Sequence, residues 1–191
     1  MNLLQHLLLK LNEESIEVAT AVVALHVAKK DTGGRWNLAD KAVDVDLEMN
    51  DLNAVIALLN EKFNFNYEIK SFSHSDSFLF EAVKLGFDYW IEKLQVACLN
   101  ASKLSAKAIQ FGLLERHEKL LENNLERIHK ALDDIYKVID ILRLKFNLPY
   151  RPDDQKIKNK CAKISKYLDY SIHLGAVLIQ PVPSDQYPQS T

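Results

Sequence analysis

The segments Leu11–Val18 (LNEESIEV) and Leu47–Leu52 (LEMNDL) both carry acids at helical spacing. The predicted helices and the predicted site are built around them. Side chains three and four positions apart lie on one face of a helix. Each segment therefore gathers its acids on one side of a predicted helix. These acids are Glu13, Glu14 and Glu17 in the first segment, and Glu48 and Asp51 in the second.

Two of these acids interrupt the apolar stripes of their helices. Glu14 lies between Leu11 and Val18, and Glu48 falls within the stripe that contains Leu52. A carboxylate on the buried side of a helix is costly unless it is paired, protonated or bound to a cation. No Lys, Arg or His is interleaved on these two faces, so a hard divalent metal ion is the simplest partner.

The composition predicts an all-helical protein. The chain has 191 residues with five Gly and five Pro, and its Leu, Ala, Lys, Glu and Asp recur with a period of 3.6 residues. A net charge of −2 gives no overall attraction to nucleic acid or to an anionic membrane. No apolar run is long enough to span a bilayer, and Met1–Leu9 lacks the features of a signal peptide. Cys98 and Cys161 show no metal or disulfide spacing, so we expect a reducing, cytoplasmic compartment.

Five helices of a bundle are predicted from periodicity and from helix-breaking residues. Gly33 and Gly34 end the first helix, and Gly86 weakens the third helix without ending it. The proline-rich residues 176–191 are expected to form a flexible tail. The predicted helices cover about 2–30, 38–62, 77–111 with Asp76 as N-cap, 117–145, and a last segment from near Ile157 to Gly175.

An internal repeat is visible around the ends of two predicted helices. The sequence KFNFNY at residues 62–67 recurs as KFNLPY at residues 145–150, an offset of 83 positions. The same offset aligns Asp51 with Asp134 and keeps the apolar positions in register. We therefore predict one domain over residues 1–175, built from tandem helical hairpins at 1–72 and 77–175; a chance similarity between Leu- and Lys-rich helices is the alternative.

The second copy has lost most of the acids. At an offset of 83, only Asp51 keeps a carboxylate, while the surrounding apolar pattern persists. A hairpin that has lost its metal and refilled the cavity shows this pattern, because inward carboxylates without a cation are unfavourable. The replaced pairs are Glu13 and Val96, Glu14 and Ala97, Glu17 and Asn100, and Glu48 and Ala131.

The acidic pattern, EExxE at residues 13–17 and ExxD at residues 48–51, resembles the signature of the all-α nucleoside triphosphate pyrophosphatases, the MazG-like and dimeric-dUTPase-like superfamily. The second half departs from this family at every acidic position except Asp134. It is similar to MazG-like proteins around residues 108–112, 123–127 and 163–168. The spacing between the acidic segments is somewhat long for the family, which leaves the loop with Gly33 and Gly34 unassigned.

The resemblance implies Mg²⁺-dependent hydrolysis of a nucleoside triphosphate to the monophosphate and pyrophosphate, with Mn²⁺ as an alternative ion. Glu13 and Glu14 are the catalytic candidates, and Glu13 would hold a second ion or orient the attacking water. The implied metal ligands are Glu14, Glu17, Glu48 and Asp51. The candidates for holding phosphate oxygens are Lys29, Lys30 and Arg35, which are otherwise solvated charges near the end of a helix.

The same resemblance places a base pocket between the two halves, with the second half in the role of a partner subunit. A nucleoside triphosphate is then the expected partner, nucleic acid and membrane are not, and pairing of two chains as a homodimer stays open. The competing interpretation is a non-catalytic helical scaffold or binding protein, in which the acids are a remnant or a structural Ca²⁺ or Mg²⁺ site.

Overall fold

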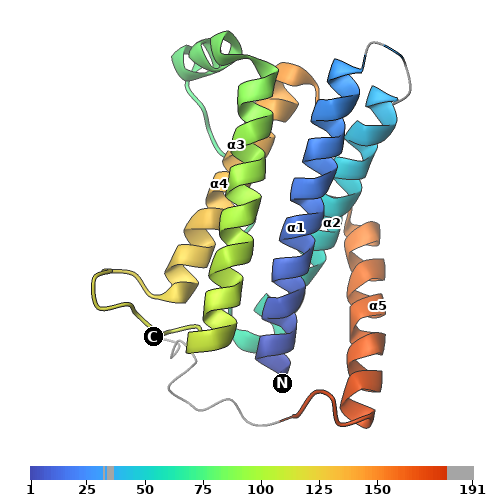
Figure 1. The fold of residues 1–191 in the computed structure, drawn as a ribbon, viewed down its shortest axis with the longest axis vertical. Coiled ribbons are helices and arrows are strands. Elements are labelled where there is room, and N and C mark those ends of the chain that lie inside the picture. Colours follow the sequence, from blue (N-terminus) through green and yellow to red (C-terminus); the bar gives the residue numbers. More distant parts are fainter. Residues whose placement is uncertain (32, 34–36, 180–191) are drawn as a thin grey trace.

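The computed structural model describes residues 1–31, 33 and 37–179, and in this part the chain is a bundle of helices (Figure 1). This confirms the predicted all-α fold class. The helices are α1 (Leu3–Lys30), α2 (Leu38–Phe63), α3 (Asp76–Phe111), α4 (Asn124–Phe146) and α5 (Asp154–His173).

The helices pack as two hairpins joined along their first helices. α1 packs against both α2 and α3, α3 packs against α4, and α5 lies against α2 (Figure 1). One contiguous apolar core runs through the bundle, with Leu11 of α1, Leu94 of α3 and Ile135 of α4 fully buried. Leu11 and Leu94 are a pair aligned by the 83-residue offset.

The second helix of each hairpin ends in the same way. α2 ends at Phe63 and α4 at Phe146, and each is followed by an asparagine in the left-handed conformation, Asn64 (φ 48°) and Asn147 (φ 57°). Asparagine tolerates this conformation better than most residues and is a common helix terminator. The two ends lie 83 positions apart, which agrees with the register that the sequence predicts for the repeat.

The segment that follows each hairpin crosses to the other hairpin. After α2, the Tyr67 hydroxyl donates to Asp133 of α4 (3.1 Å) and the Phe72 N–H donates to Asp140 of α4 (2.8 Å). After α4, Asn53 of α2 donates its amide N–H to the Tyr150 hydroxyl (3.0 Å). These exchanged segments tie the two halves into one unit.

Three predicted features of the helices are wrong. α4 begins at Asn124 and not near residue 117, because Asn123 and Glu126 form a capping box there and residues 112–123 make a loop. Gly86 does more than weaken α3: its φ of 82° breaks the helical geometry and kinks the helix, a conformation that glycine adopts without steric cost. The N-cap of α3 is Ser75, one residue before the predicted Asp76.

The start of the predicted tail is packed. Val177 is buried, and the Leu178 N–H donates to the Met1 carbonyl oxygen (2.9 Å), so the chain at these two residues belongs to the fold. Residues 180–191 of that predicted tail lie outside the described residues. None of the described helices combines the length and apolarity needed to cross a bilayer.

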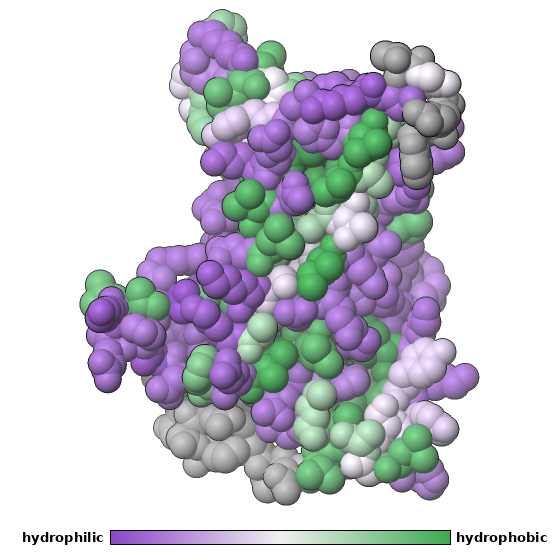
Figure 2. All heavy atoms as spheres, viewed as in Figure 1, coloured by the Kyte–Doolittle hydropathy of each residue, from purple (hydrophilic) through white to green (hydrophobic). Residues whose placement is uncertain are grey.

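The surface of the bundle retains apolar side chains. Figure 2 shows them among charged groups on the face where α1 and α3 lie in Figure 1. The exposed large apolar residues of these two helices include Ile16, Val23, Val27, Val96 and Leu99. Exposed apolar surface is a feature of protein–protein interfaces, and homodimer formation stays a prediction.

Candidate functional site

Three of the predicted acids converge between α1 and α2. Glu14 and Glu17 of α1 and Glu48 of α2 each offer a carboxylate oxygen, and these oxygens lie within 4.8 Å of one another. Glu14 is 4% exposed because it occupies a core position of the α1 stripe, whereas Glu17 is exposed. The cluster therefore has one buried and one solvent-facing side, an arrangement that can hold a hard cation with open positions for water or phosphate.

One oxygen of the buried acid of this cluster lacks a hydrogen-bond partner in the part of the chain that the structure describes. Glu14 Oε2 is buried and has no hydrogen-bond partner among the described residues. Burial raises the pKa of Glu14 to about 7; Lys160 opposes this shift and Glu17 adds to it. Burial also raises the pKa of Glu48, with further contributions from the charges of Glu17 and Asp51. A cation between these carboxylates would relieve both effects.

A lysine from another part of the chain already approaches this cluster. Lys160 of α5 places its Nζ 3.1 Å from Glu14 Oε1 and 2.5 Å from Asp51 Oδ2. Burial acts to lower the pKa of Lys160, but the hydrogen bond to Asp51 and the charge of Glu14 outweigh it, and the net shift is upward. No basic residue of α1 or α2 lies among the three acids, as the sequence indicated. In the folded chain, however, Lys160 of α5 is a basic partner of Glu14 and Asp51.

α5 is held over the acids by buried polar residues of α2. Asp46 accepts a hydrogen bond from the Arg151 N–H (3.0 Å) and pairs with Lys156 Nζ (2.8 Å). Asn50 accepts from the Asp153 N–H (2.8 Å), one residue before α5 begins. These contacts fix the start of α5. They thereby place Lys160, which is one helical turn beyond Lys156, next to the acids.

The lysines of α5 form a basic wall beside the acidic cluster. Lys156, Lys160 and Lys163 recur at helical spacing and, with Asn159, face Asp51 across a pocket of about 310 Å³. The sequence interpretation missed these residues. Their signal was the i, i+4, i+7 spacing, which puts three lysines on one side of the last helix.

The other predicted site residues lie elsewhere. Glu13 pairs with Lys10 on the same helix and is outside the group of three acids. Lys29 is bound to Asp88 (3.1 Å) and lies over the Phe87 ring (4.2 Å). At about 1.5 Å per residue, Lys29 and Lys30 are roughly 18 Å or more from Glu17 along α1. The structure does not bring these lysines to the acids, and Arg35 lies outside the described residues.

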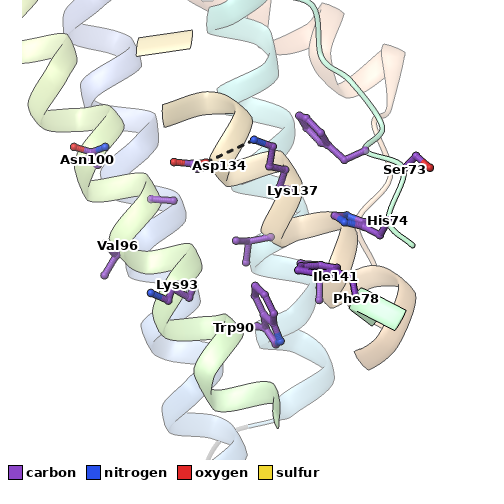
Figure 3. Close-up of a pocket in the computed structure, with 13 residues that line it drawn as sticks. Ser73, His74, Phe78, Trp90, Lys93, Val96, Asn100, Asp134, Lys137 and Ile141 are labelled. Atoms are coloured by element: carbon purple, nitrogen blue, oxygen red, sulfur yellow. Dashed lines mark ion pairs between the residues drawn. The ribbon is translucent and has the colours of Figure 1, made fainter. Parts of the chain in front are cut away.

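The corresponding face of the second hairpin carries a pocket in place of an acidic cluster. Val96, Ala97, Asn100 and Asp134, which the 83-residue offset aligns with Glu13, Glu14, Glu17 and Asp51, line a cavity of about 580 Å³ (Figure 3). Within the described residues, the metal-ligating side chains gather in a group of three only at the first hairpin.

Comparison with protein-family models, with curated proteins and with solved structures found no match. The fold and the site define the protein by its architecture. It is an all-helical bundle of two hairpins, with an acidic cluster on one hairpin and a lysine-rich helix packed across that cluster.

Proposed function

We propose that the protein is a metal-dependent nucleoside triphosphate pyrophosphohydrolase that releases the monophosphate and pyrophosphate. The observation that carries this proposal is the buried Glu14 carboxylate, whose Oε2 has no hydrogen-bond partner among the described residues and which converges with Glu17 and Glu48. The resemblance of the acidic motif to the MazG-like family supports the same reaction class. The agreement of the helix ends with the 83-residue offset supports a duplicated bundle with one acidic hairpin.

In this proposal, Glu14, Glu17 and Glu48 hold the ion, and Asp51 joins them when Lys160 releases it. A bound Mg²⁺ or Mn²⁺ supplies charge neutralisation at the phosphate oxygens and lowers the pKa of water. Water attacks the α-phosphorus of the nucleotide. The bond between this phosphorus and the pyrophosphate oxygen breaks, pyrophosphate leaves, and the proton of the attacking water passes to solvent. The lysines of α5 lie where they can contact phosphate oxygens that project from the acids.

Lys160 has two roles in this proposal. Without a metal ion, its ammonium group neutralises Glu14 and Asp51, so the folded state tolerates the buried charge. With a metal–nucleotide complex bound, the same group turns to the phosphates, because a divalent ion replaces its positive charge at the acids. Lys156 and Lys163 line the same pocket as Lys160 and add positive charge beside the proposed phosphate site.

The test is pyrophosphate release from a panel of deoxynucleoside and ribonucleoside triphosphates with Mg²⁺ or Mn²⁺. The wild type should be active on at least one nucleotide, and Glu17→Gln should lose about 100-fold or more of that activity, since a metal at a phosphate is worth several kcal/mol. Glu61→Gln, an exposed acid at the far end of α2, is the matched control and should keep full activity. Silence of the folded wild type across the panel would reject the proposal.

A non-catalytic scaffold is the second candidate, and one observation favours it. Lys160 already pairs with Glu14 and Asp51, so the fold does not need a metal ion to accept these acids. A scaffold whose acids are a remnant predicts that Mg²⁺ and Mn²⁺ leave the melting temperature unchanged, whereas the pyrophosphohydrolase predicts an increase that Glu17→Gln removes. A scaffold with a structural metal site predicts the same increase but no release of pyrophosphate.

A further inference from the structure

One feature that the proposed reaction does not use is a cavity between α3 and α4. Its volume of about 580 Å³ lies in the range of small-molecule sites. Figure 3 shows side chains from α3, from α4 and from the segment before α3 around it. Because the acids of the first hairpin are absent here, this cavity needs an account of its own.

One side of the cavity is aromatic. The rings of Phe78 and Trp90 lie 6.3 Å apart at 66°, and His74 stacks on Phe78 at 5.3 Å and 15°. Phe72 adds a fourth ring to the lining. His74 Nε2 is buried and has no hydrogen-bond partner among the described residues. Such a corner of rings favours a flat aromatic group.

The cavity also carries an excess of positive charge. Lys93 and Lys137 line it together with a single acid, Asp134. Lys137 Nζ lies 3.9 Å from Asp134 Oδ1, which is a long ion pair, and 5.1 Å from the centre of the Phe72 ring. Lys93 lies over the Tyr89 ring (5.3 Å) and has no carboxylate within ion-pair distance in the described part of the chain. Two cations facing one acid favour an anionic ligand.

We propose that this cavity binds a planar aromatic molecule that carries an anionic group. The ring lies against Phe72, Phe78 and Trp90, and the anion meets Lys93 and Lys137. The chemistry is shared by nucleoside monophosphates and by aromatic acids. The proposal does not depend on hydrolysis at the first hairpin, because it uses no residue of the acidic cluster.

The test uses two probes with the same ring system, 1-anilinonaphthalene-8-sulfonate and N-phenyl-1-naphthylamine, which lacks the sulfonate. The first should bind more tightly to the folded wild type. The double variant Lys93→Gln/Lys137→Gln should weaken the sulfonate probe about fivefold, as expected for two partly exposed charge pairs, and leave the neutral probe unchanged. Lys84→Gln is the matched control, because Lys84 is exposed over the Phe80 ring and does not line the cavity.

A second variant locates the probe. Val96 is 63% exposed at the cavity rim, so Val96→Trp fills the mouth without changing the core and should abolish binding of both probes. Unchanged binding in Val96→Trp, or equal losses of both probes in the lysine double variant, would overturn the proposal. Circular dichroism checks that each variant is folded.

Competition then separates the two sources of ligand. Displacement of the sulfonate probe by AMP or dUMP, but not by indole-3-carboxylate, assigns the cavity to nucleotides, and the reverse result assigns it to aromatic acids. Failure of all three to displace a probe that Val96→Trp excludes would overturn the proposal. If the cavity binds its probe while the wild type releases no pyrophosphate, only the proposed hydrolysis fails.

Discussion

The acidic face of the α1–α2 hairpin and the corresponding face of the α3–α4 hairpin differ in what covers them. On the first, α5 brings Lys160 to Glu14 and Asp51 and closes the face with charge. On the second, the chain before α3 brings Phe72 and the first turn of α3 brings Phe78, and a cavity remains. The comparison teaches that each face and the segment that covers it match in chemistry: lysines cover the acids, and aromatic rings line the cavity.

The covering segments themselves align at the offset that aligns the hairpins. Lys160 corresponds to Ser77 and Lys156 to Ser73, so the cations of α5 have no counterparts in the segment before α3. Where the acids are gone, the lysines that would pair with them are gone as well. This is the pattern expected if acids and lysines act as one electrostatic unit.

The variant with the largest expected effect is Glu14→Gln. It gives the first hairpin an uncharged side chain at this position, as the second hairpin has at Ala97. Turnover should fall about 100-fold or more, because the buried ligand is lost. The metal-free protein should be as stable as the wild type or more stable at pH 8, by about 2 kcal/mol, since the variant has no carboxyl with a raised pKa.

The sign of this effect follows from proton binding. The folded state holds the Glu14 proton up to a pKa of about 7, compared with an ordinary value of 4.5, so the free energy of unfolding falls as pH rises through this window. Urea denaturation at pH 5 and pH 8 should show this fall in the wild type and a smaller one in the variant. An identical pH dependence in the two proteins would contradict the assignment.

Lys160→Gln should have the next largest effect. It leaves Glu14 and Asp51 without their cation, and we expect a loss of about 2 kcal/mol in the metal-free protein at pH 8, because one partner of a largely buried pair is removed. Thermal unfolding at pH 8 measures the loss, which should shrink at pH 5, where Glu14 is protonated. Millimolar Mg²⁺ should restore part of it if the acids bind the ion.

The control for Lys160→Gln is Lys156→Gln, on the same face of α5. Lys156 is more exposed, and its partner Asp46 also accepts the Arg151 N–H, so the expected loss is below about 1 kcal/mol. Equal losses in the two variants would show that Lys160 acts only by anchoring α5.

The smallest expected effect compares the two exchanged segments. Tyr150→Phe leaves the Asn53 amide without its acceptor, and Asn53 is only 1% exposed, so we expect a loss of about 1–2 kcal/mol. Tyr67→Phe leaves the half-buried Asp133 carboxylate accessible to water, and the expected loss is below about 1 kcal/mol. Urea unfolding of the two variants gives the order, and a larger loss for Tyr67→Phe would contradict it.

Much of the fold was accessible from the sequence because helical periodicity is a local signal. The ends of α1, α2, α3 and α4 lie within a residue of their predicted positions, because glycines follow α1 and α3 and asparagines follow α2 and α4. The start of α4 was missed, because residues 117–123 (HEKLLEN) mix charged residues and leucines as a helix does, and the capping box at Asn123 decides the boundary.

The candidate site was accessible only in part. Glu14, Glu17 and Glu48 were found because their spacing on two helices is visible in the sequence. Lys160 was missed because it lies 109 positions beyond Asp51, and periodicity within one helix says nothing about which helix it faces. Lys29 was placed near the acids by its position beside the glycine loop, but it bonds to Asp88 of α3.

The distance along the chain between Asp51 and Lys160 has a consequence for biosynthesis. The acids leave the ribosome long before the lysine that neutralises them, so the first hairpin has to hold its carboxylates hydrated or protonated while the second is being made. Closing the acidic face therefore has to wait until α5 has been made. A chain that stops before α5 would lack Lys160, and the acids between α1 and α2 would form an uncovered, negatively charged surface.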